Sequence, residues 1–328
     1  MSWVASLRSR AAAARKRVLF PESGDARTLD AVRALAREGI VVPALLLDPR
    51  HGADHAAARA TGVETLDPAA HADRDAVAAA LAARRASHGL TRVEAAELAR
   101  RPLWFADGLV ALGRADACVA GAATTTADVL RAALWAVGPA PGIRTVSSCF
   151  YMVTRTAGVL TFADCGVVQY PTAEQLAEIA VAAARDRRLV VGDEPVVAFL
   201  SHSTKGSAEG DSVDKVRRAV ELFRALEPGV PADGDLQGDA ALVPLIARRK
   251  APGSPAAGRA NVLVFPDLDS GNIAYKLVQR IAQVPALGPV VQGLARPCSD
   301  LSRGATADDI VLVSAIALLQ SRAASQGG

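Results

Sequence analysis

The chain has 328 residues, of which 51% are hydrophobic and 22% are charged, with a formal net charge of +3. This composition excludes a largely disordered chain, which would need low hydrophobicity and a high net charge. The small and dispersed charge also argues against a nucleic-acid binder. At about 150 residues per domain, the length predicts two domains. Because no apolar run approaches the roughly 18 residues of a membrane span, no membrane association is expected.

The four cysteines are scattered along the chain, without a CxxC pair and without metal-ligand spacing to histidine. They are Cys118, Cys149, Cys165 and Cys298. This pattern predicts free thiols in a reducing, cytoplasmic compartment rather than a disulfide scaffold or a zinc site. Residues 1–17 lack the apolar stretch of a secretory signal. Their Arg and Ser content leaves a transit peptide as the alternative to the short leading helix that we expect.

Residues 17–48 form the first recognisable unit of secondary structure. A short apolar run at 18–20 is followed by turn residues and then by residues 27–38, whose apolar side chains have near-helical spacing. Gly39 is a candidate C-cap for this helix. The apolar segment 40–48 is typical of a buried strand. The order strand, helix, strand predicts a parallel sheet.

The same alternation continues along the chain. Helices are predicted at 74–89, 91–101, 102–115, 124–138, 171–190, 213–226, 270–284 and 310–321, and strands at 115–121, 145–154, 158–168, 195–201 and 260–268. The two consecutive strands between 145 and 168 indicate an antiparallel or mixed section of sheet, so we place a domain boundary near residue 140. Residues 248–261, rich in Pro and Gly, are predicted to be a surface loop.

Three segments combine a strand, a polar loop that contains glycine, and a helix. They are VLF-PESGDA at 18–26, FLS-HSTKGSAEGDS at 199–212 and VLVFP-DLDSGN at 262–272. In a parallel sheet such loops lie at the carboxyl ends of the strands, where ligands usually bind, and the helix N-termini there favour anions. Helix capping alone explains any one of these loops. The three together favour an anionic ligand, but none matches a P-loop or a dinucleotide fingerprint.

The segment 298–313 is the most unusual part of the C-terminal region. Ser302, Arg303 and Gly304 lie in a loop just before an apolar helix. Thr306 and Asp309 have the three-residue spacing of a capping box, and on periodicity alone capping is a sufficient role for Asp309. The five histidines do not form a recognisable Ser/His/Asp triad, and metal-ligand spacing is absent.

Segments spread over nearly the whole chain resemble phosphate acetyltransferase (phosphotransacetylase), in the order and spacing of that family. The matching segments are VLFPESGDARTLDAV, GLVALGRADACVAGAATTTADVLR, LTFADCGVVQYPTAEQLAEIA, LSHSTKGSA, KAPGS, NVLVFPDLDSGNIAYKLVQR, GPVVQGL and DLSRG. The run FPDLDSGNIAYKLVQR followed by GPVVQGL and DLSRG is highly specific. The resemblance is to the short, single-module form of the family.

This resemblance implies an α/β fold with two domains, each a mainly parallel sheet flanked by helices, and a cleft between them. Domain two, at 141–289, is expected to be inserted into domain one, at 1–140 plus 290–328. The implied activity is reversible acetyl transfer between CoA and inorganic phosphate (acetyl-CoA + phosphate = acetyl phosphate + CoA), by direct thiolate attack in a ternary complex. CoA, acetyl phosphate and phosphate are the expected partners, as substrates of a cytoplasmic homodimer that needs no metal and no cofactor.

The resemblance also implies roles for particular residues. The serine and arginine of the family's SRG motif fall on Ser302 and Arg303, and its catalytic aspartate falls on Asp309. We expect the aspartate to act as the base that accepts the thiol proton, and the arginine to stabilise developing negative charge. The residues expected to bind substrate are Arg85, Arg131, Thr124, Ser203 and Lys205.

Three alternatives remain at this stage. Thr124 stands where many members of the family have histidine, which leaves open a phosphate butyryltransferase-like enzyme that uses a longer acyl group. A dehydrogenase of the same broad plan would need an aspartate cluster for a metal ion and a cofactor loop, and the sequence has neither. A non-catalytic module, like the transferase-like domain appended to malic enzymes, is disfavoured by the intact Ser302, Arg303 and Asp309.

Overall fold

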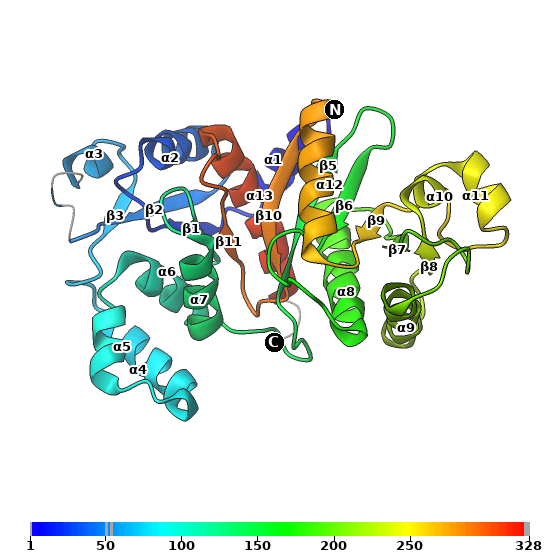
Figure 1. The fold of residues 1–328 in the computed structure, drawn as a ribbon. Helices are drawn as coiled ribbons and strands as arrows, with labels where there is room; N and C mark the ends of the chain where they lie inside the picture. Colours follow the sequence, from blue (N-terminus) through cyan, green and yellow to red (C-terminus); the bar gives the residue numbers. More distant parts are fainter. Residues whose placement is uncertain (1, 50–51, 53–54, 325–328) are drawn as a thin grey trace. The chain divides into compact units, whose positions relative to one another are not determined.

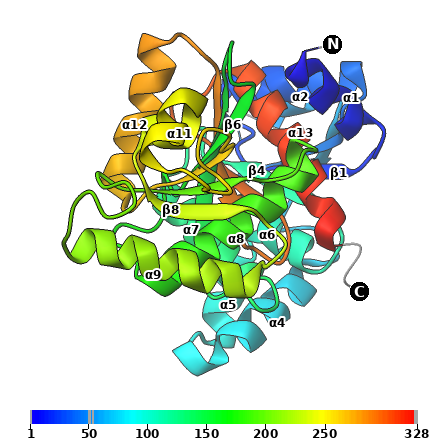
Figure 2. The same ribbon diagram turned by 90° about the vertical axis from the view of Figure 1, so that its right-hand side faces the viewer.

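The computed structural model describes residues 2–49, 52 and 55–324, with only the backbone described for 322–324. The chain divides into two compact units. Unit 1 comprises Met1–Pro141 and Leu294–Gly328, and unit 2 comprises Gly142–Gly293. Each unit is a β-sheet with helices on both faces, as Figures 1 and 2 show. The predicted α/β fold class, with mainly parallel sheets flanked by helices, is therefore confirmed.

The sheet of unit 1 is parallel throughout its described strands. Its order is β11-β4-β1-β2-β3. The bounds are Arg17–Phe20 for β1, Val42–Leu46 for β2, Glu64–Leu66 for β3, Ala117–Ala120 for β4 and Cys298–Asp300 for β11. Strand β4 is buried along its whole length, as expected for a parallel sheet that helices cover on both faces.

Helices α2 and α13 pack on one face of this sheet, and α6 and α7 pack on the other (Figure 1). The helical segments of unit 1 are α1 (Trp3–Ala12), α2 (Ala26–Glu38), α3 (His55–Arg59), α4 (Arg74–Arg85), the 3-10 turn η2 (Ala86–His88), α5 (Arg92–Leu98), α6 (Pro102–Ala111), α7 (Thr126–Ala136) and α13 (Ala307–Ala324). The Asp25 side chain caps the N-terminus of α2. Gly39 ends the helix in the left-handed conformation, as the sequence predicts.

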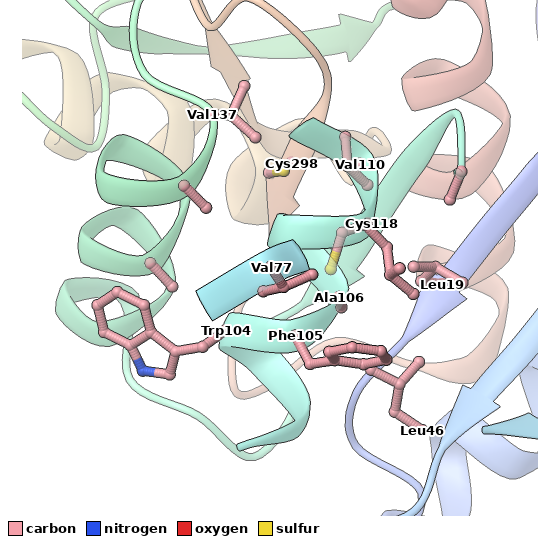
Figure 3. Packing of buried hydrophobic residues seen from close by; sticks show 14 of the residues in the cluster. Leu19, Leu46, Val77, Trp104, Phe105, Ala106, Val110, Cys118, Val137 and Cys298 are labelled. Atoms are coloured by element: carbon pink, nitrogen blue, oxygen red, sulfur yellow. The ribbon is translucent and has the colours of Figure 1, made fainter. Parts of the chain in front are cut away.

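The core of unit 1 lies between the sheet and helices α4, α6 and α7 (Figure 3). Phe105 of α6 is fully buried in this core, together with aliphatic residues from the helices and the sheet. Cys118 of β4 and Cys298 of β11 are paired residues in the sheet, and both are buried in this core. Because the chain has few aromatic residues, Ala, Val and Leu supply most of the packing.

The sheet of unit 2 is mixed, with the order β10-β5-β6-β9-β7-β8. The bounds are Ser147–Val153 for β5, Val159–Ala163 for β6, Val197–Leu200 for β7, Ala232–Leu236 for β8, Val262–Val264 for β9 and Ala286–Gln292 for β10. Strand β5 is antiparallel to β10 and β6, whereas β6, β9, β7 and β8 are parallel. The antiparallel section predicted for 145–168 is thus confirmed.

Helices α8 and α9 cover one face of the second sheet, and α12 contacts the other face at β5 and β6 (Figure 2). The helices of unit 2 are α8 (Ala173–Val190), α9 (Asp211–Leu226), α10 (Gly238–Leu242), α11 (Pro244–Lys250) and α12 (Leu268–Ile281). Helix α12 also presents an exposed apolar stripe, defined by Ile273, Leu277 and Ile281. These residues are four apart, so they lie on one side of the helix.

Some elements differ from the sequence predictions. Strands β3, β8, β10 and β11 were not predicted: β3 and β11 are each three residues long, β8 has the polar sequence ADGDL, and β10 is interrupted by Gly288 and Pro289. Helix α11 takes residues 248–250 from the predicted surface loop. In the part of the chain that the structure describes, no helix is both long and apolar enough to cross a membrane.

Candidate active site

Three loops meet at one edge of the sheet of unit 1. They follow β1, β4 and β11, which are neighbours in the sheet and run parallel. Their residues are 21–25, 121–125 and 301–306, and they lead into the N-termini of α2, α7 and α13. Because the carboxyl ends of parallel strands share an edge, chain segments far apart in sequence come together here. Helix N-termini favour negatively charged groups, so this edge suits an anionic ligand.

Glu22 holds the loop that follows β4. Its side chain is buried and accepts hydrogen bonds from four successive backbone amides. Oε2 accepts from Gly121 at 3.1 Å and Ala122 at 2.8 Å, and Oε1 accepts from Ala123 at 3.0 Å and Thr124 at 2.7 Å. Four amides that point at one carboxyl group fix the path of the loop and the start of α7.

Asp300, at the end of β11, supports the same loop from the other side. Its Oδ2 accepts a hydrogen bond of 2.7 Å from Thr126 Oγ1, in the first turn of α7. Burial raises the pKa of Asp300 to about 6, although the bond from Thr126 acts to lower it. Gly121 has a φ of +109°, and a Cβ there would collide with the Asp300 carboxyl and the Leu301 amide. The close approach of these two strand ends therefore requires glycine.

A pocket of about 550 Å³ opens at this edge of unit 1. Its walls are the loop after β1, the start of α6 and the β4–α7 segment. Thr124 and Arg131, both predicted to bind substrate, line it. Arg131 is half exposed and donates a hydrogen bond of 2.8 Å to Asp128, which also lines the pocket. The pocket thus offers a guanidinium and a hydroxyl to a ligand.

Arg85 contacts helix α7, which helps to line the pocket, through an aromatic side chain. Its guanidinium stands 4.6 Å from the ring centroid of Trp135 on α7, one turn after Arg131. Trp135 in turn packs edge-to-face against Trp104, which lines the pocket, with ring centroids 5.3 Å apart. Cation–π contact of this kind orients a guanidinium while leaving its edge available to an anion. The structure thus links Arg85 and Arg131 through α7.

Ser302 and Arg303 are exposed in the loop between β11 and α13. The Ser302 hydroxyl accepts a hydrogen bond of 3.3 Å from the Gly304 amide. Asp309 forms the predicted capping box, because its Oδ2 accepts from the Thr306 amide and hydroxyl, each at 2.8 Å. The Thr306 hydroxyl also accepts from the Asp309 amide at 3.2 Å. Oδ1 of Asp309 makes no hydrogen bond to any residue that the structure describes.

Ser203 and Lys205 belong to unit 2, in the loop between β7 and α9. The Ser203 hydroxyl is buried and exchanges hydrogen bonds with the backbone of Ala208. The Lys205 ammonium is paired with the buried carboxyl of Asp233 on β8. Both predicted substrate-binding residues therefore have partners inside their own unit, and a role in binding remains a prediction for each.

Three residues that organise this edge could not be recognised from the sequence: Glu22, Arg27 and Asp300. Arg27, in the first turn of α2, donates to Asp25, to Ala122 and to the loop before α13. Polar residues next to strand ends were the available signal, but their partners are distant in sequence. Among the described residues, no group of three or more His, Cys, Asp or Glu side chains is arranged to hold a metal ion.

Comparison with known proteins identifies the family. A family model described as phosphate acetyl/butaryl transferase matches residues 2–318. The chain belongs to this family. The match spans all the residues of the candidate site, including Ser302, Arg303 and Asp309.

Members of the phosphate acetyl/butaryl transferase family resemble this chain over almost its full length. The phosphate acetyltransferase of Treponema pallidum is 46% identical, over 98% of this chain and 99% of its own length. That of Thermoanaerobacterium thermosaccharolyticum is 44% identical, over 98% and 100%. The crystal structure of a phosphotransacetylase from Streptococcus pyogenes matches with a TM-score of 0.91 and 38% identity, over 98% of each chain.

Proposed function

We propose that the chain is an acyltransferase that moves an acetyl group reversibly between CoA and inorganic phosphate. The observation that carries the proposal is that the loop with Ser302 and Arg303, which leads to Asp309 in the first turn of α13, is tied through Arg27 to the loop after β4. Thr124 and two arginines, Arg101 and Arg131, line the pocket together with carboxylates such as Asp128, and we assign the guanidinium groups to the anionic parts of the substrates. The relatives that are 46% and 44% identical over almost their full length are named phosphate acetyltransferases.

The reaction requires a thiolate, because the neutral thiol of CoA is a poor nucleophile. An alkyl thiol has a pKa near 8.5, so only a few per cent is ionised at pH 7. In the proposed step the sulfur forms a bond to the acetyl carbon, the bond from that carbon to the phosphate oxygen breaks, and the thiol proton passes to Asp309. Capping and base catalysis are compatible, since Oδ2 of Asp309 holds the helix start and Oδ1 is open to the thiol.

Negative charge develops on the acetyl carbonyl oxygen and on the departing phosphate as the thiolate attacks. Arg303 is exposed and makes no side-chain hydrogen bond to the residues that the structure describes, so its planar guanidinium is available to these oxygens. The hydroxyl of Ser302, the preceding residue, is suited to orient the thiol or donate to the oxyanion. Direct transfer in a ternary complex needs no covalent intermediate on the protein.

Arg85, whose guanidinium lies over the Trp135 ring, and Arg131, four residues before Trp135 on α7, carry two positive charges that we assign to anions of the substrates. These are the phosphates of CoA or inorganic phosphate. Thr124 is assigned to the wall near the acyl group. Ser203 and Lys205 are assigned to the substrates through the loop of unit 2 that they stabilise.

The acetyl group is favoured over a longer acyl group because the close relatives are named phosphate acetyltransferases. A homodimer is also proposed, supported by the exposed apolar stripe of α12. A cytoplasmic location is supported by the cysteines at 118, 149, 165 and 298, which are free and buried. Reduced thiols of this kind suit a reducing compartment.

The test is CoA-dependent release of phosphate from acetyl phosphate by the purified protein. Propionyl phosphate and butyryl phosphate serve as competing acyl donors, and a reaction without CoA serves as the blank. We expect turnover with CoA only, and the highest kcat/KM with acetyl phosphate. A higher kcat/KM with butyryl phosphate would favour the longer-chain enzyme, and no CoA-dependent release from any donor would contradict the proposed function.

A further inference from the structure

We propose that Arg27 is a positioning residue that fixes the main chain of Arg303. The inference rests on the proposed function, in which the Arg303 side chain stabilises the transferring group. Arg27 lies in the first turn of α2, 276 positions before Arg303 in the chain.

All five N–H donors of the Arg27 guanidinium are engaged within unit 1. Nη1 donates to the carbonyl oxygens of Arg303 at 2.7 Å and Ala305 at 2.9 Å. Nη2 donates to the carbonyl oxygen of Ala122 at 2.6 Å and to Asp25 at 2.7 Å. Nε donates to the other carboxyl oxygen of Asp25 at 3.1 Å.

We call the Arg27 guanidinium and its hydrogen bonds to the loop carbonyl oxygens the clamp. Asp25, at the N-terminus of helix α2, holds this guanidinium in place. Asp25 caps this helix by accepting from the amides of Arg27 at 2.9 Å and Thr28 at 3.2 Å. The same carboxyl group therefore holds the helix start and the guanidinium. Because α2 is packed on the sheet, the loop before α13 is tied to a rigid element.

The three carbonyl oxygens that Arg27 binds come from two loops. Arg303 and Ala305 belong to the loop after β11, whereas Ala122 belongs to the loop after β4. A planar fork with fixed donor directions can reach all three while it also binds Asp25, but a lysine ammonium with three donors cannot. The guanidinium thus sets the distance between the two loops.

Two observations make this a positioning role rather than direct contact with substrate. Every donor of Arg27 already has a protein acceptor, so none is left for a phosphate. The Arg303 side chain, by contrast, has no hydrogen bond to any described residue, so its direction depends on how its main chain is held. Loss of the clamp would move the Arg303 guanidinium relative to the loop after β4.

The first test compares Arg27→Lys with Arg33→Lys. Arg33 is on the same helix but is exposed and pairs only with Asp30 among the described residues. We expect Arg27→Lys to lower kcat by about 10- to 100-fold, since misplacement by about 1 Å can cost that much. KM for CoA and acetyl phosphate should change by less than about 3-fold, and Arg33→Lys should match the wild type. A folded Arg27→Lys enzyme with wild-type kcat overturns the proposal.

The decisive measurement is a double-mutant cycle with Arg303→Lys. If Arg27 acts through Arg303, the loss caused by Arg27→Lys should shrink to about 3-fold or less once Arg303 is already replaced. A merely structural role would give equal fold losses in both backgrounds, and that result overturns the proposal. Should Arg27→Lys fail to fold, Asp25→Asn loosens the same clamp while keeping a capping group, and its cycle with Arg303→Lys decides in the same way.

Amide hydrogen exchange separates this proposal from the proposed function, because it needs no turnover. We expect faster exchange at residues 301–306 and 121–125 in Arg27→Lys than in Arg33→Lys. Unchanged exchange in both segments overturns the clamp. If exchange is faster in Arg27→Lys but the wild-type protein releases no phosphate from acetyl phosphate, the clamp is supported and the proposed function is contradicted.

Discussion

Asp107 places a carboxyl group inside the core of unit 1. It lies on α6 and is fully buried near Cys118 and Cys298, whose side chains Figure 3 shows in this core. No hydrogen bond of ordinary geometry reaches either of its carboxyl oxygens from the described residues. Burial raises the pKa of Asp107 to about 7, although weak interactions with the Cys298 and Cys118 thiols act to lower it. Burial also raises the pKa of both thiols.

This raised pKa predicts that stability falls as the pH rises. The ordinary pKa of the carboxyl group is 3.8, so between about pH 4 and pH 7 Asp107 holds its proton in the folded state but loses it in the unfolded state. Folding is therefore favoured at the acid end of this window and loses that contribution through pH 7. Moving a pKa from 3.8 to about 7 corresponds to roughly 4 kcal/mol. Asp300, whose pKa is raised to about 6, acts in the same direction.

Asp107→Asn tests this contribution, because the amide does not titrate. The free energy of unfolding, measured with denaturant at pH 5, 6, 7 and 8, should fall less steeply with pH in the variant than in the wild type. Asp300 contributes part of the slope that remains. Identical slopes for the two proteins would show that Asp107 does not carry the effect.

We expect the Arg85→Ala and Arg131→Ala variants to differ in which substrate has the raised KM, because each arginine is assigned to an anion of a substrate. If they hold anions in the ground state, replacing either with Ala should mainly raise KM for CoA or for acetyl phosphate. Dephospho-CoA lacks the 3′-phosphate, so the arginine that binds that group should matter little with this substrate. Equal losses with CoA and dephospho-CoA would assign that arginine to another anion.

The loop between β4 and α7 depends on one side chain from another part of unit 1. Glu22→Gln replaces one acceptor oxygen with an NH₂ group that faces two backbone amides, so buried donors lose their partner. We expect the free energy of unfolding to fall by about 1–3 kcal/mol. Glu97→Gln, at an exposed pair with Arg100, is the control and should change it by less than about 0.5 kcal/mol. Similar losses in the two variants would mean that the four amides do not depend on Glu22.

The elements that could be predicted from sequence are those with local signals. Helix α2 has amphipathic spacing and a glycine C-cap, and α8 begins with a capping box at Thr172. Strand β11 could not be predicted, because three residues carry no periodicity. Glu22 and Arg27 were missed as organising residues for a different reason. Their partners lie about 100 and 276 positions away in the chain, so only the folded sheet reveals them.

For the whole molecule, the family could be predicted because its motifs run through the entire chain. The match over residues 2–318 confirms that prediction. The roles of Ser302, Arg303 and Asp309 remain predictions, since a motif gives the type of residue but not its state in the reaction. The structure adds that Asp309 does cap α13, which periodicity alone had indicated.

The proposed homodimer should depend on the apolar stripe of α12. Leu277→Lys places a charge in the middle of that stripe, between Ile273 and Ile281. We expect sedimentation at micromolar concentration to show a dimer for the wild type and a monomer for the variant. Leu226→Lys, at another exposed leucine on α9, is the control and should remain dimeric. A variant at Leu277 that stays dimeric would place the interface elsewhere.

Asp309→Asn tests the proposed chemistry most directly, with Asp308→Asn, at its exposed neighbour, as the control. Asparagine still accepts a hydrogen bond at the helix start, so stability should change by less than about 1 kcal/mol. It cannot take the thiol proton, so kcat at pH 7 should fall by roughly 10²- to 10⁴-fold. Raising the pH toward 8.5 should restore part of the activity, because the thiol then ionises unaided. A folded Asp309→Asn enzyme with wild-type kcat at pH 7 would contradict the account.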